Sequence, residues 1–429
     1  MRNQEAAQFV LLRQMFDAAV EVAKSTDGIK AALPAPPEGR TVVIGAGKAA
    51  ALMASAVEAA WPTDVSGIVV VPDGYGLPTA RIDVREAGHP VPDERGAAAA
   101  KAILDAVSDL SERDLVLCLV SGGGSALLPV PAVTLDLDEK QRITSHLLRS
   151  GATIAEMNCV RKHLSGIKGG RLALACHPAR VESFIVSDVA GDDLSAIASG
   201  PTVPDPTTSG EALAILDRYA IAIGEHLRAW LGSPESETPK PTHPAFRTVV
   251  NHLVATPAMA LRAAARVAER AGYQAVILGD VIEGEAREVG RAFAGIARAV
   301  RTGASSLPRR CVLLSGGETT VTVKGTGRGG RNSEFLLGLA IGLDGTDGIY
   351  ALAADTDGRD GPGDAAGAVV GPDTVMRARE RCLDPHDALR DNDAGGLFDA
   401  LGDAVRTGPT FTNVNDFRAI IVDSDGGRP

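Results

Sequence analysis

The stretch TVVIGAGKAAALMASAVEAAW, residues 41–61, decides the fold class of this chain. It begins with a continuous apolar run, and Gly45 and Gly47 then turn the chain into an alanine-rich segment that we expect to be helical. Apolar runs at residues 67–71 and 115–120 are followed by further helical patterns or glycine turns. Apolar strands that alternate with helices predict a parallel sheet covered on both faces, and therefore an α/β fold.

Length and composition limit the classes of protein to which this chain can belong. A chain of 429 residues is expected to form two domains, and a hydrophobic content of 45% is enough for their cores. The net charge of −11 provides no electrostatic basis for nucleic-acid binding. Five scattered cysteines without a CxxC pair indicate buried thiols in a reducing compartment. With no signal-peptide pattern and no apolar run of about 18 residues, we expect a globular cytoplasmic protein without a membrane partner.

A proline-rich segment divides the two halves of the chain. Residues 232–246 contain four prolines and few apolar residues, which predicts a linker. Strand and helix patterns resume beyond it. The expected domains are therefore residues 1–238 and residues 245–429.

The most distinctive stretch of the second half is VLLSGGETTVTVKGTGRGGRNSE, residues 312–334. Its apolar run is expected to break at Ser315-Gly316-Gly317, and residues 319–323 alternate like a strand. A loop follows with four glycines and three cations, Lys324, Arg328 and Arg331. Glycine lets backbone N–H groups crowd an anion, and the cations supply the opposing charge. The stretch predicts a phosphate or other anion site, with a plain glycine-rich turn as the alternative.

Two more glycine-rich loops follow strands of the first half. Residues 45–50, GAGKAA, fit the dinucleotide pattern G-x-G-x-x-G/A, with Asp73 as the acid expected after the second strand. Lys48 adds positive charge at a helix N-terminus, which suits phosphoryl chemistry at least as well as NAD. A tight turn with an exposed lysine is the alternative. Residues 121–125, SGGGS, offer N–H donors and two hydroxyls for a phosphate or a carboxylate. A nucleophilic serine is less favoured, because no G-x-S-x-G motif is present.

Charged residues cluster in three further segments. Arg161, Lys162, His163, Lys168 and Arg171 suit a small anion, although a solvated helix face would look the same. Two groups of aspartates end strands and suggest Mg²⁺, with helix caps and turns as the alternative. These aspartates are Asp188, Asp192, Asp193, Asp355, Asp357, Asp360 and Asp364.

Together these segments resemble the glycerate 2-kinases of the MOFRL type, some of which carry the label hydroxypyruvate reductase. The resemblance extends over almost the whole chain. The stretches that carry it are GAGKAA (45–50), SGGGSALL (121–128), MNCVRKHLSGIKGGRLA (157–173), SDVAGDDLSAIASGPTVPDPTT (187–208), GDVIEGEAREVG (279–290), LLSGGETTVTVKGTGRGGRNSEF (313–335), ADTDGRDGPGDAAGA (354–368) and TNVNDFRAIIV (412–422). The clearest departure is Ser333, where the family pattern leads us to expect glutamine.

The resemblance implies ATP-dependent phosphorylation of the C2 hydroxyl of D-glycerate, with Mg²⁺, to give 2-phosphoglycerate. It also implies an N-terminal Rossmann-like domain, a C-terminal mixed α/β domain and an active site in the cleft between them. We expect a monomer or a homodimer. Only the resemblance favours the 2-phosphate over the 3-phosphate product.

On this interpretation Lys48 and Arg331 are the catalytic cations, and the general base is sought among Asp188, Asp192 and Asp193. The basic residues Arg161, Lys162, Lys168 and Arg171 are assigned to glycerate, and Asp193, Asp355 and Asp357 to the metal. The residues assigned to nucleotide or phosphate are Gly45, Gly47, Ser121, Gly122, Gly123, Gly124, Ser125, Ser315, Gly316, Gly317, Glu318, Lys324, Gly327, Arg328, Gly330 and Asn332.

Two rival functions stay open on the sequence. An NAD(P)H-dependent hydroxypyruvate reductase would explain the G-x-G-x-x-A pattern, but it needs a catalytic acid, and His163 is the sole histidine in the loops singled out. A non-catalytic phosphosugar-binding protein would explain the glycine-rich loops without any need for Mg²⁺.

Overall fold

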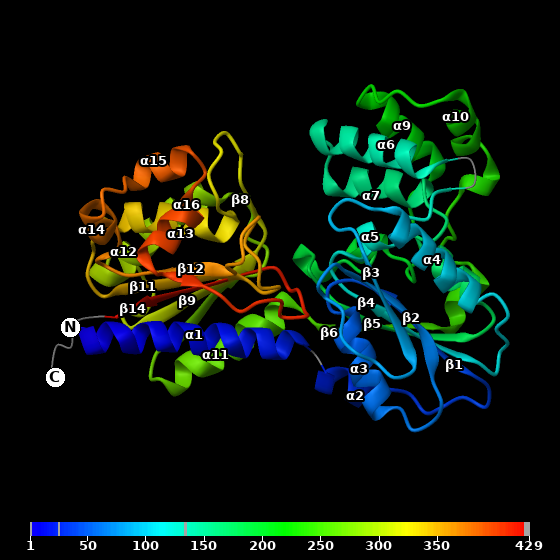
Figure 1. Cartoon of the computed structure of the whole chain (residues 1–429), viewed down its shortest axis with the longest axis horizontal. Coiled ribbons are helices and arrows are strands. Elements are labelled where there is room, and N and C mark those ends of the chain that lie inside the picture. The colour runs from blue at the N-terminus through cyan, green and yellow to red at the C-terminus, as the bar shows by residue number, and fades with distance from the viewer. Residues whose placement is uncertain (1, 25, 133–134, 424–429) are drawn as a thin grey trace. The chain divides into compact units, whose positions relative to one another are not determined.

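The computed structural model describes residues 2–24, 26–132 and 135–423, which belong to two compact units (Figure 1). The first unit is residues 25–254, and the second unit combines residues 1–24 with residues 255–429. The N-terminal helix is thus part of the same unit as the C-terminal half of the chain. Each unit is described by itself below.

The first unit is built on a six-stranded sheet with the strand order β3-β2-β1-β4-β5-β6. The pairings from β3 through β5 are all parallel. The strands are β1 (Thr41–Ala46), β2 (Ser66–Pro72), β3 (Ile82–Ala87), β4 (Leu115–Val120), β5 (Arg180–Val186) and β6 (Val249–Ala255). The helices are α2 (Thr26–Ala32), α3 (Ala50–Ala60), α4 (Glu94–Ala106), α5 (Gly124–Leu127), α6 (Leu137–Arg149), α7 (Ile154–His163), α8 (Arg171–Cys176), α9 (Ser209–Arg218) and α10 (Glu225–Leu231).

This strand order has a topological switch point between β1 and β4, because the chain leaves β1 toward β2 on one side and leaves β4 toward β5 on the other. The register pairs Thr41 with Leu115 and Ala46 with Val120, so the two strands end level with each other. Every residue of both strands is buried. In doubly wound sheets a ligand binds at such a point, outside the carboxyl ends of the strands. The predicted Rossmann-like fold is confirmed.

The second unit contains a mixed six-stranded sheet with the order β13-β12-β11-β14-β9-β7. Its strands are β7 (Gln274–Gly279), β9 (Cys311–Gly317), β11 (Ile349–Asp355), β12 (Gly367–Val370), β13 (Ala404–Val405) and β14 (Asp416–Val422), and β8 (Gly284–Glu285) pairs separately with β10 (Thr319–Thr320). Its helices are α1 (Arg2–Lys24), α11 (Pro257–Arg270), α12 (Ala286–Thr302), α13 (Arg331–Leu343), α14 (Thr374–Glu380), α15 (Pro385–Arg390) and α16 (Ala394–Leu401).

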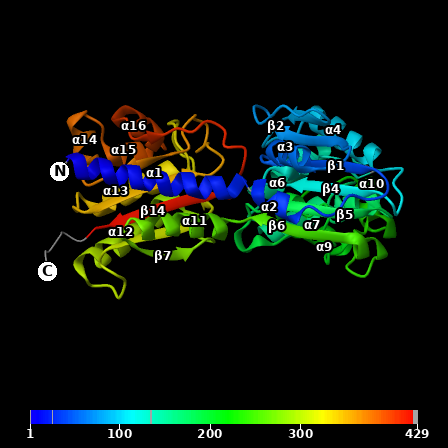
Figure 2. The same ribbon diagram turned by 90° about the horizontal axis from the view of Figure 1, so that it is seen from below.

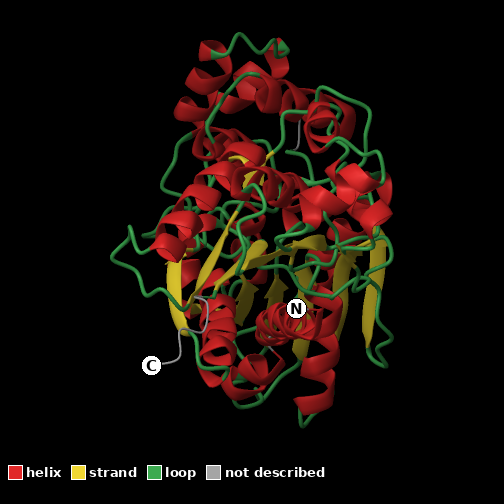
Figure 3. Cartoon of the chain, turned by 90° about the vertical axis from the view of Figure 1, so that its left-hand side faces the viewer, coloured by secondary structure: helices red, strands yellow, loops and turns green. Residues whose placement is uncertain are grey.

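Helices cover both faces of the mixed sheet (Figure 3). On one face α1 lies beside α11, as Figure 2 shows from below, and on the other face α12 packs along α13. The predicted mixed α/β architecture of the C-terminal half is therefore confirmed. Within the described residues, no helix has the length and apolar character needed to cross a membrane.

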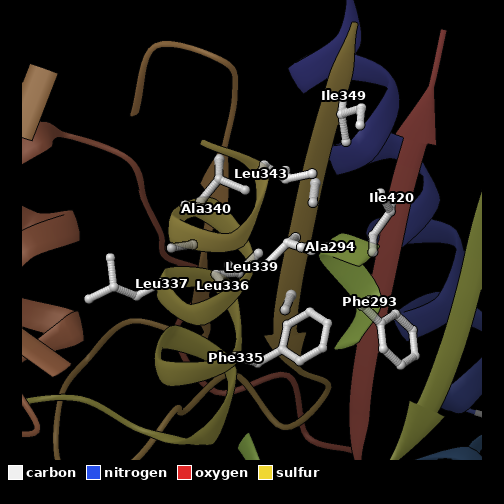
Figure 4. Packing of buried hydrophobic residues seen from close by; sticks show 14 of the residues in the cluster. Phe293, Ala294, Phe335, Leu336, Leu337, Leu339, Ala340, Leu343, Ile349 and Ile420 are labelled. Atoms are coloured by element: carbon white, nitrogen blue, oxygen red, sulfur yellow. The ribbon is translucent and has the colours of Figure 1, made fainter. Parts of the chain in front are cut away.

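The core of the second unit depends on the close crossing of α12 and α13. Phe293 and Phe335 meet edge to face with ring centroids 5.4 Å apart, and both lie in the cluster drawn in Figure 4. Gly290 permits this approach, because a Cβ added there would lie 2.1 Å from the carbonyl oxygen of Phe335. Gly338 faces the backbone of Arg287 in the same way.

Three local predictions were wrong. The strand expected at residues 319–323 ends at Thr320, because the next N–H groups donate to side chains: that of Thr322 to Glu285 and that of Lys324 to Asn392. The expected break at Ser315-Gly316-Gly317 lies inside β9. Residues 209–231, for which the sequence predicts one helix, instead form the two helices α9 and α10.

The division between α9 and α10 follows from the backbone at Ala220, which has a φ of 51°. A residue in this left-handed region cannot continue a right-handed helix. Residues 232–246, predicted to be a linker, contain Ser236 and Thr238, both buried. The described chain divides after Val254 rather than at this segment.

We predict opposite effects for two glycine-to-alanine changes in α12. Alanine has a higher helix propensity than glycine by about 1 kcal/mol. Gly295→Ala adds its methyl group where no atom lies within 4 Å, so it should raise the free energy of unfolding. Gly290→Ala should lower it by about 1–3 kcal/mol, because the Cβ meets backbone atoms of α13. Urea unfolding of both variants measures the difference, and equal effects would contradict the close crossing.

Candidate active site

The loops after β1 and β4 bind each other at the switch point. The Ser121 hydroxyl accepts a hydrogen bond from the Ala49 N–H at 2.9 Å, and the Lys48 N–H donates to the Gly122 carbonyl at 2.9 Å. Gly47 has a φ of 133°, and a Cβ there would lie 2.2 Å from the Ser121 hydroxyl oxygen. Glycine is therefore required at this position by both backbone conformation and space.

Lys48 lies just before α3, where the helix N-terminus favours an anion. Its side chain passes Gly123, since a Cβ at Gly123 would lie 3.7 Å from the Lys48 Cγ. His89 is on the same side, with its Nε2 3.0 Å from that position. The geometry thus brings Lys48 and the SGGGS loop together, as predicted, and adds His89, which the sequence did not single out.

Ser125, the last residue of the SGGGS loop, contacts two residues from distant segments. Its hydroxyl oxygen lies 2.8 Å from the Nζ of Lys168 and 3.0 Å from the hydroxyl oxygen of Ser199. The Lys168 amine also donates to the Ser125 carbonyl at 2.5 Å. Ser199 and its neighbour Ala198 both have a left-handed backbone, with φ values of 61° and 50°, which is unusual for residues other than glycine.

The four predicted glycerate-binding cations do not share one environment. Lys162 forms a buried ion pair with Asp205 at 3.4 Å, and Arg171 donates to the Ser236 carbonyl at 2.7 Å. Lys168 binds Ser125. Arg161 is half-buried, and among the described residues it has neither a hydrogen bond nor an ion pair, while burial lowers its pKa. Of the four cations, Arg161 is therefore the one whose charge is available to bind a ligand.

The ring of the neighbouring His163 is held by contacts with other residues of the first unit. Its Nδ1 lies 2.9 Å from the Cys159 carbonyl oxygen and its Nε2 3.5 Å from the Thr238 hydroxyl. Burial lowers its pKa, although the Cys159 carbonyl and the Asp205 carboxylate oppose the shift. Its buried bonds within the first unit explain this histidine without a catalytic role.

The three aspartates predicted as general-base candidates follow β5. Asp193 accepts from Ser195 with both carboxylate oxygens, from the N–H at 2.9 Å and from the hydroxyl at 3.1 Å. Asp192 has a left-handed φ of 56°, and its Oδ1 is buried without a partner in the described structure. Asp188 takes part in interactions of its own. Asp192 therefore has a buried acceptor oxygen that no group of the described structure contacts.

In the second unit, Arg331 begins α13 and is held by three carboxylates. Its Nε donates to Asp416 at 2.6 Å, and its two terminal nitrogens donate to Glu318 at 3.0 Å and Asp355 at 2.8 Å. Burial would lower its pKa, but these carboxylates raise it above the ordinary arginine value. A guanidinium has five N–H donors, so two stay available for a ligand such as phosphate.

Asp416 is the acceptor on which this cluster depends. It begins β14, opposite Asp355 on β11 and Gly317 on β9, and its side chain is fully buried. Besides Arg331 it accepts from the Asn332 amide at 2.8 Å, from the Thr319 N–H at 3.2 Å and from Arg418. Asp416 was not among the residues predicted for the site, because its partners are far away in the chain.

Ser333, the residue that departs from the family pattern, also has a defined partner. Its N–H and hydroxyl donate to Asp360 at 2.8 and 2.6 Å, and the Asn332 N–H donates to the same carboxylate at 2.9 Å. Burial raises the pKa of Asp360, and these hydrogen bonds oppose the shift. Asp360 thus holds the first turn of α13, and Ser333 contributes to it.

The N–H groups of the glycine-rich loop that precedes α13 are largely occupied. Those of Lys324 and Gly325 donate to the Asn392 side chain at 2.7 and 3.0 Å, and that of Arg328 donates to the Asp393 carboxylate at 2.8 Å. The Gly327 N–H donates to the Asp391 carbonyl at 2.9 Å. Whatever this loop binds must therefore be contacted mainly through the side chains of Lys324 and Arg328.

The remaining phosphate-site predictions of the second unit lie in β9 or directly before α13. Ser315, Gly316 and Gly317 are buried in β9, and the Ser315 hydroxyl has no partner in the described structure. Gly330 precedes Arg331, and a Cβ there would lie 2.3 Å from a carboxylate oxygen of Asp360.

The predicted metal ligands belong to different units. Across residues 2–24, 26–132 and 135–423, no group of three or more histidine, cysteine, aspartate or glutamate side chains is arranged to hold a metal ion. Asp355 and Asp357 lie together after β11, and the Asp355 Oδ1 accepts from the Asp357 N–H at 3.1 Å. Two carboxylates fit Mg²⁺, whose other ligands are usually phosphate oxygens and water. Asp193 is in the first unit, with both oxygens bound to Ser195.

Comparisons with known proteins agree with this architecture. Residues 11–232 match the model of a domain of unknown function, DUF4147, and residues 311–416 match the MOFRL family. A D-glycerate 2-kinase of Thermotoga maritima is 42% identical over 391 residues, covering 90% of this chain and 92% of the relative. A putative hydroxypyruvate reductase of Agrobacterium vitis is 52% identical over 415 residues, covering 96% and 94%.

A solved structure is similar as well. The crystal structure of a glycerate kinase from Thermotoga maritima has a TM-score of 0.89 and 38% identity, covering 97% of this chain and all of the other. A doubly wound sheet with glycine loops at its switch point, joined to a mixed sheet with a carboxylate-held arginine, defines the class as a two-unit α/β enzyme. The matches over nearly the full length make it more specific. The chain belongs to the MOFRL-type glycerate kinase family.

Two of the three carboxylates that hold Arg331 give a matched test of this cluster. Asp416→Asn removes a buried carboxylate that serves two arginines, so it should lower the free energy of unfolding by about 3–5 kcal/mol. Glu318→Gln changes a side chain that is 54% exposed and should cost about 0–1 kcal/mol. Chemical denaturation of both variants checks the difference, and similar losses would show that Asp416 is not the central acceptor.

Proposed function

We propose that this chain transfers the γ-phosphoryl group of ATP to the C2 hydroxyl of D-glycerate, which gives 2-phosphoglycerate and ADP. The observation that carries the proposal is the place of Lys48, in a glycine loop at the switch point and at the N-terminus of α3. Relatives named glycerate 2-kinase, similar over most of this chain, favour glycerate as the acceptor.

Phosphoryl transfer requires positioning and charge neutralisation more than covalent catalysis. Lys48 is proposed to bind a transferring phosphoryl oxygen with its amine, while the SGGGS loop donates backbone N–H groups. Arg331 offers its remaining N–H donors, with its plane fixed by Asp355 and Asp416. Lys324 and Arg328 are proposed to contact the nucleotide.

For glycerate, Arg161 is the proposed carboxylate ligand, because its half-buried charge has no protein partner in the described structure. Lys162 and Arg171 already bind protein groups, so their proposed effect on the substrate is electrostatic. Asp188, Asp192 and Asp193 remain candidates for the general base, and the unpartnered Oδ1 favours Asp192 among them.

Mg²⁺ is proposed as the metal, with Asp355 and Asp357 as its protein ligands. When bound, it would neutralise charge on the phosphates during transfer. Asp193 is the weaker choice, because it belongs to the first unit, whereas Asp355 and Asp357 lie together after β11 in the second unit.

The reductase alternative has less support from the site. A dinucleotide site of this type uses an acid after the second strand to bind the ribose hydroxyls. Asp73 is that acid here, and Arg95 holds it in a two-pronged ion pair with distances of 2.7 and 2.8 Å. The reductase name of relatives is thus not matched by a free ribose-binding carboxylate.

Product analysis tests the function directly. With D-glycerate, ATP and Mg²⁺, ³¹P and ¹H NMR should show 2-phosphoglycerate and ADP in equal amounts. The same preparation should not oxidise NADPH or NADH in the presence of hydroxypyruvate. Formation of 3-phosphoglycerate would correct the position of transfer, and NAD(P)H oxidation without ATP turnover would replace the kinase by the reductase.

The two proposed catalytic cations should be essential for turnover. Lys48→Ala and Arg331→Ala each remove charge stabilisation of the transferring phosphoryl group, so kcat should fall about 100-fold or more. Circular dichroism and the melting temperature establish whether each variant is folded. Arg331→Lys serves as a milder variant, since it keeps a positive charge among the carboxylates. Turnover near that of the wild type in a folded variant would remove that residue from the site.

A further inference from the structure

Lys168 is a buried lysine without an acidic partner. Its residue is 3% exposed, and its amine contacts the hydroxyl and the carbonyl of Ser125. Among the described residues, no carboxylate lies within ion-pair distance of this amine, in contrast to Lys162, which is paired with Asp205. A buried ammonium that lacks an anion is costly, so the neutral amine is the form that this environment favours.

The charged groups around Lys168 also favour the neutral form of its amine. Burial lowers its pKa well below the ordinary lysine value, and the positive charges of Lys140 and Arg161 lower it further. A neutral amine has a lone pair, so it can accept a proton from the Ser125 hydroxyl while one of its own N–H groups donates to the Ser125 carbonyl. The observed contacts of 2.8 and 2.5 Å match this pair of bonds.

Backbone hydrogen bonds hold the participants in place. The Gly169 N–H donates to the Ser199 carbonyl at 3.0 Å, so the segment that contains Lys168 is tied to the segment that contains Ser199. The Lys168 N–H itself lies 3.3 Å from the Ser165 hydroxyl. Ser199, in turn, contacts the Ser125 hydroxyl. Three segments far apart in the sequence thus fix one serine hydroxyl against one amine.

Ser125 also has access to a ligand. It is partly exposed, and it follows Gly123, which lies beside the Lys48 side chain. An accessible serine hydroxyl that is hydrogen-bonded to a neutral lysine amine can act as a serine–lysine proton relay. In such a relay the lysine increases the basicity of the serine oxygen. The sequence could not show this, because Ser125 and Lys168 are 43 positions apart.

We propose that the Ser125–Lys168 pair, in place of an aspartate of the loop after β5, accepts the proton of the substrate hydroxyl during phosphoryl transfer, an inference that rests on the proposed function. The C2 hydroxyl gives its proton to the Ser125 oxygen as the Ser125 proton moves to the Lys168 amine. The C2 oxygen forms its bond to the γ-phosphorus, and the bond from that phosphorus to the bridging oxygen of ADP breaks. Lys168 ends as an ammonium and returns its proton to solvent after product release. Ser125 touches the substrate, and Lys168 acts through it.

The pH dependence of kcat tests this relay. The amine must be neutral to accept a proton, so wild-type kcat should rise with pH through the lowered pKa of Lys168 and then level off. Lys168→Met and Ser125→Ala should lower the high-pH plateau of kcat about 100-fold or more. They should also remove the rise of kcat with pH below that plateau, which is the acid limb of the profile. Their KM for ATP should stay within about threefold of the wild-type value, because neither change removes a phosphate contact of Lys48.

Lys140 provides a matched control, since it is another buried lysine. It donates to the Val130 carbonyl at 2.8 Å, it has no serine hydroxyl as a partner in the described structure, and burial lowers its pKa to about 7. Lys140→Met should lose stability as Lys168→Met does but should keep the plateau kcat and an acid limb. Ser125→Thr keeps the hydroxyl and should retain part of the activity. Small alkylamines added to Lys168→Ala should restore turnover in proportion to their basicity.

Several results would overturn the relay. The relay would be contradicted if kcat of folded Lys168→Met or Ser125→Ala still rose with pH as in the wild type. If that rise were lost in Asp192→Asn alone, the acceptor of the substrate proton would be Asp192. If Lys168→Met does not fold, the profile of Ser125→Ala decides, because Ser125 is partly exposed. Wild-type protein without glycerate phosphorylation would refute the proposed function itself, whereas an active wild type with unaffected variants would refute only the relay.

Discussion

The close approach of β1 and β4 at their carboxyl ends is the constraint on which the candidate site depends. A Cβ at Gly45 would lie 2.1 Å from the carbonyl oxygen of Leu119, so the two strands can run level only with glycine there. Beyond the strands, the Ser121 hydroxyl and the Gly122 carbonyl hold the backbone of the next loop. This places Lys48, the SGGGS loop and Ser125 at one point of the sheet edge, where a ligand is expected.

The two units use cations in chemically different ways. Arg331 lies among carboxylates and remains charged, because a guanidinium keeps its proton in proteins. It can therefore provide a fixed, oriented positive charge. The Lys168 amine contacts the neutral hydroxyl and carbonyl of Ser125, and a buried lysine in such a place readily gives up its proton. A reaction that transfers a phosphoryl group and removes a hydroxyl proton needs both kinds of group.

The sequence predicts most strands of both sheets, because these strands are apolar runs followed by glycine or aspartate, but it does not predict β3, β12 or β13. It also predicts which loops gather at a sheet edge, since the carboxyl ends of parallel strands lie on one side. It fails where side chains replace backbone partners, as at Thr322, whose N–H binds Glu285 instead of a neighbouring strand. It also fails at residues 232–246, where Ser236 and Thr238 bind Arg171 and Asp205 within the first unit.

Long-range pairing explains what was missed in the site. Asp416 looks like a turn residue before a strand, and its role comes from Arg331, 85 positions earlier. Ser199 becomes notable only through its backbone conformation and its contact with Ser125. The individual roles of Lys48 and Arg331 were suggested by family resemblance, and their charge and surroundings are consistent with the proposal.

Hydrogen exchange at the backbone amides, followed by mass spectrometry, tests the central claim most directly. With a non-hydrolysable ATP analogue, Mg²⁺ and D-glycerate, the account predicts slower exchange at residues 45–49 and 121–125 of the first unit. It also predicts slower exchange at residues 315–318 of the second unit, and no such change with NADPH. Protection by NADPH in place of the ATP analogue, or no protection at residues 45–49 and 121–125, would contradict a phosphoryl-transfer site at the switch point of the first unit.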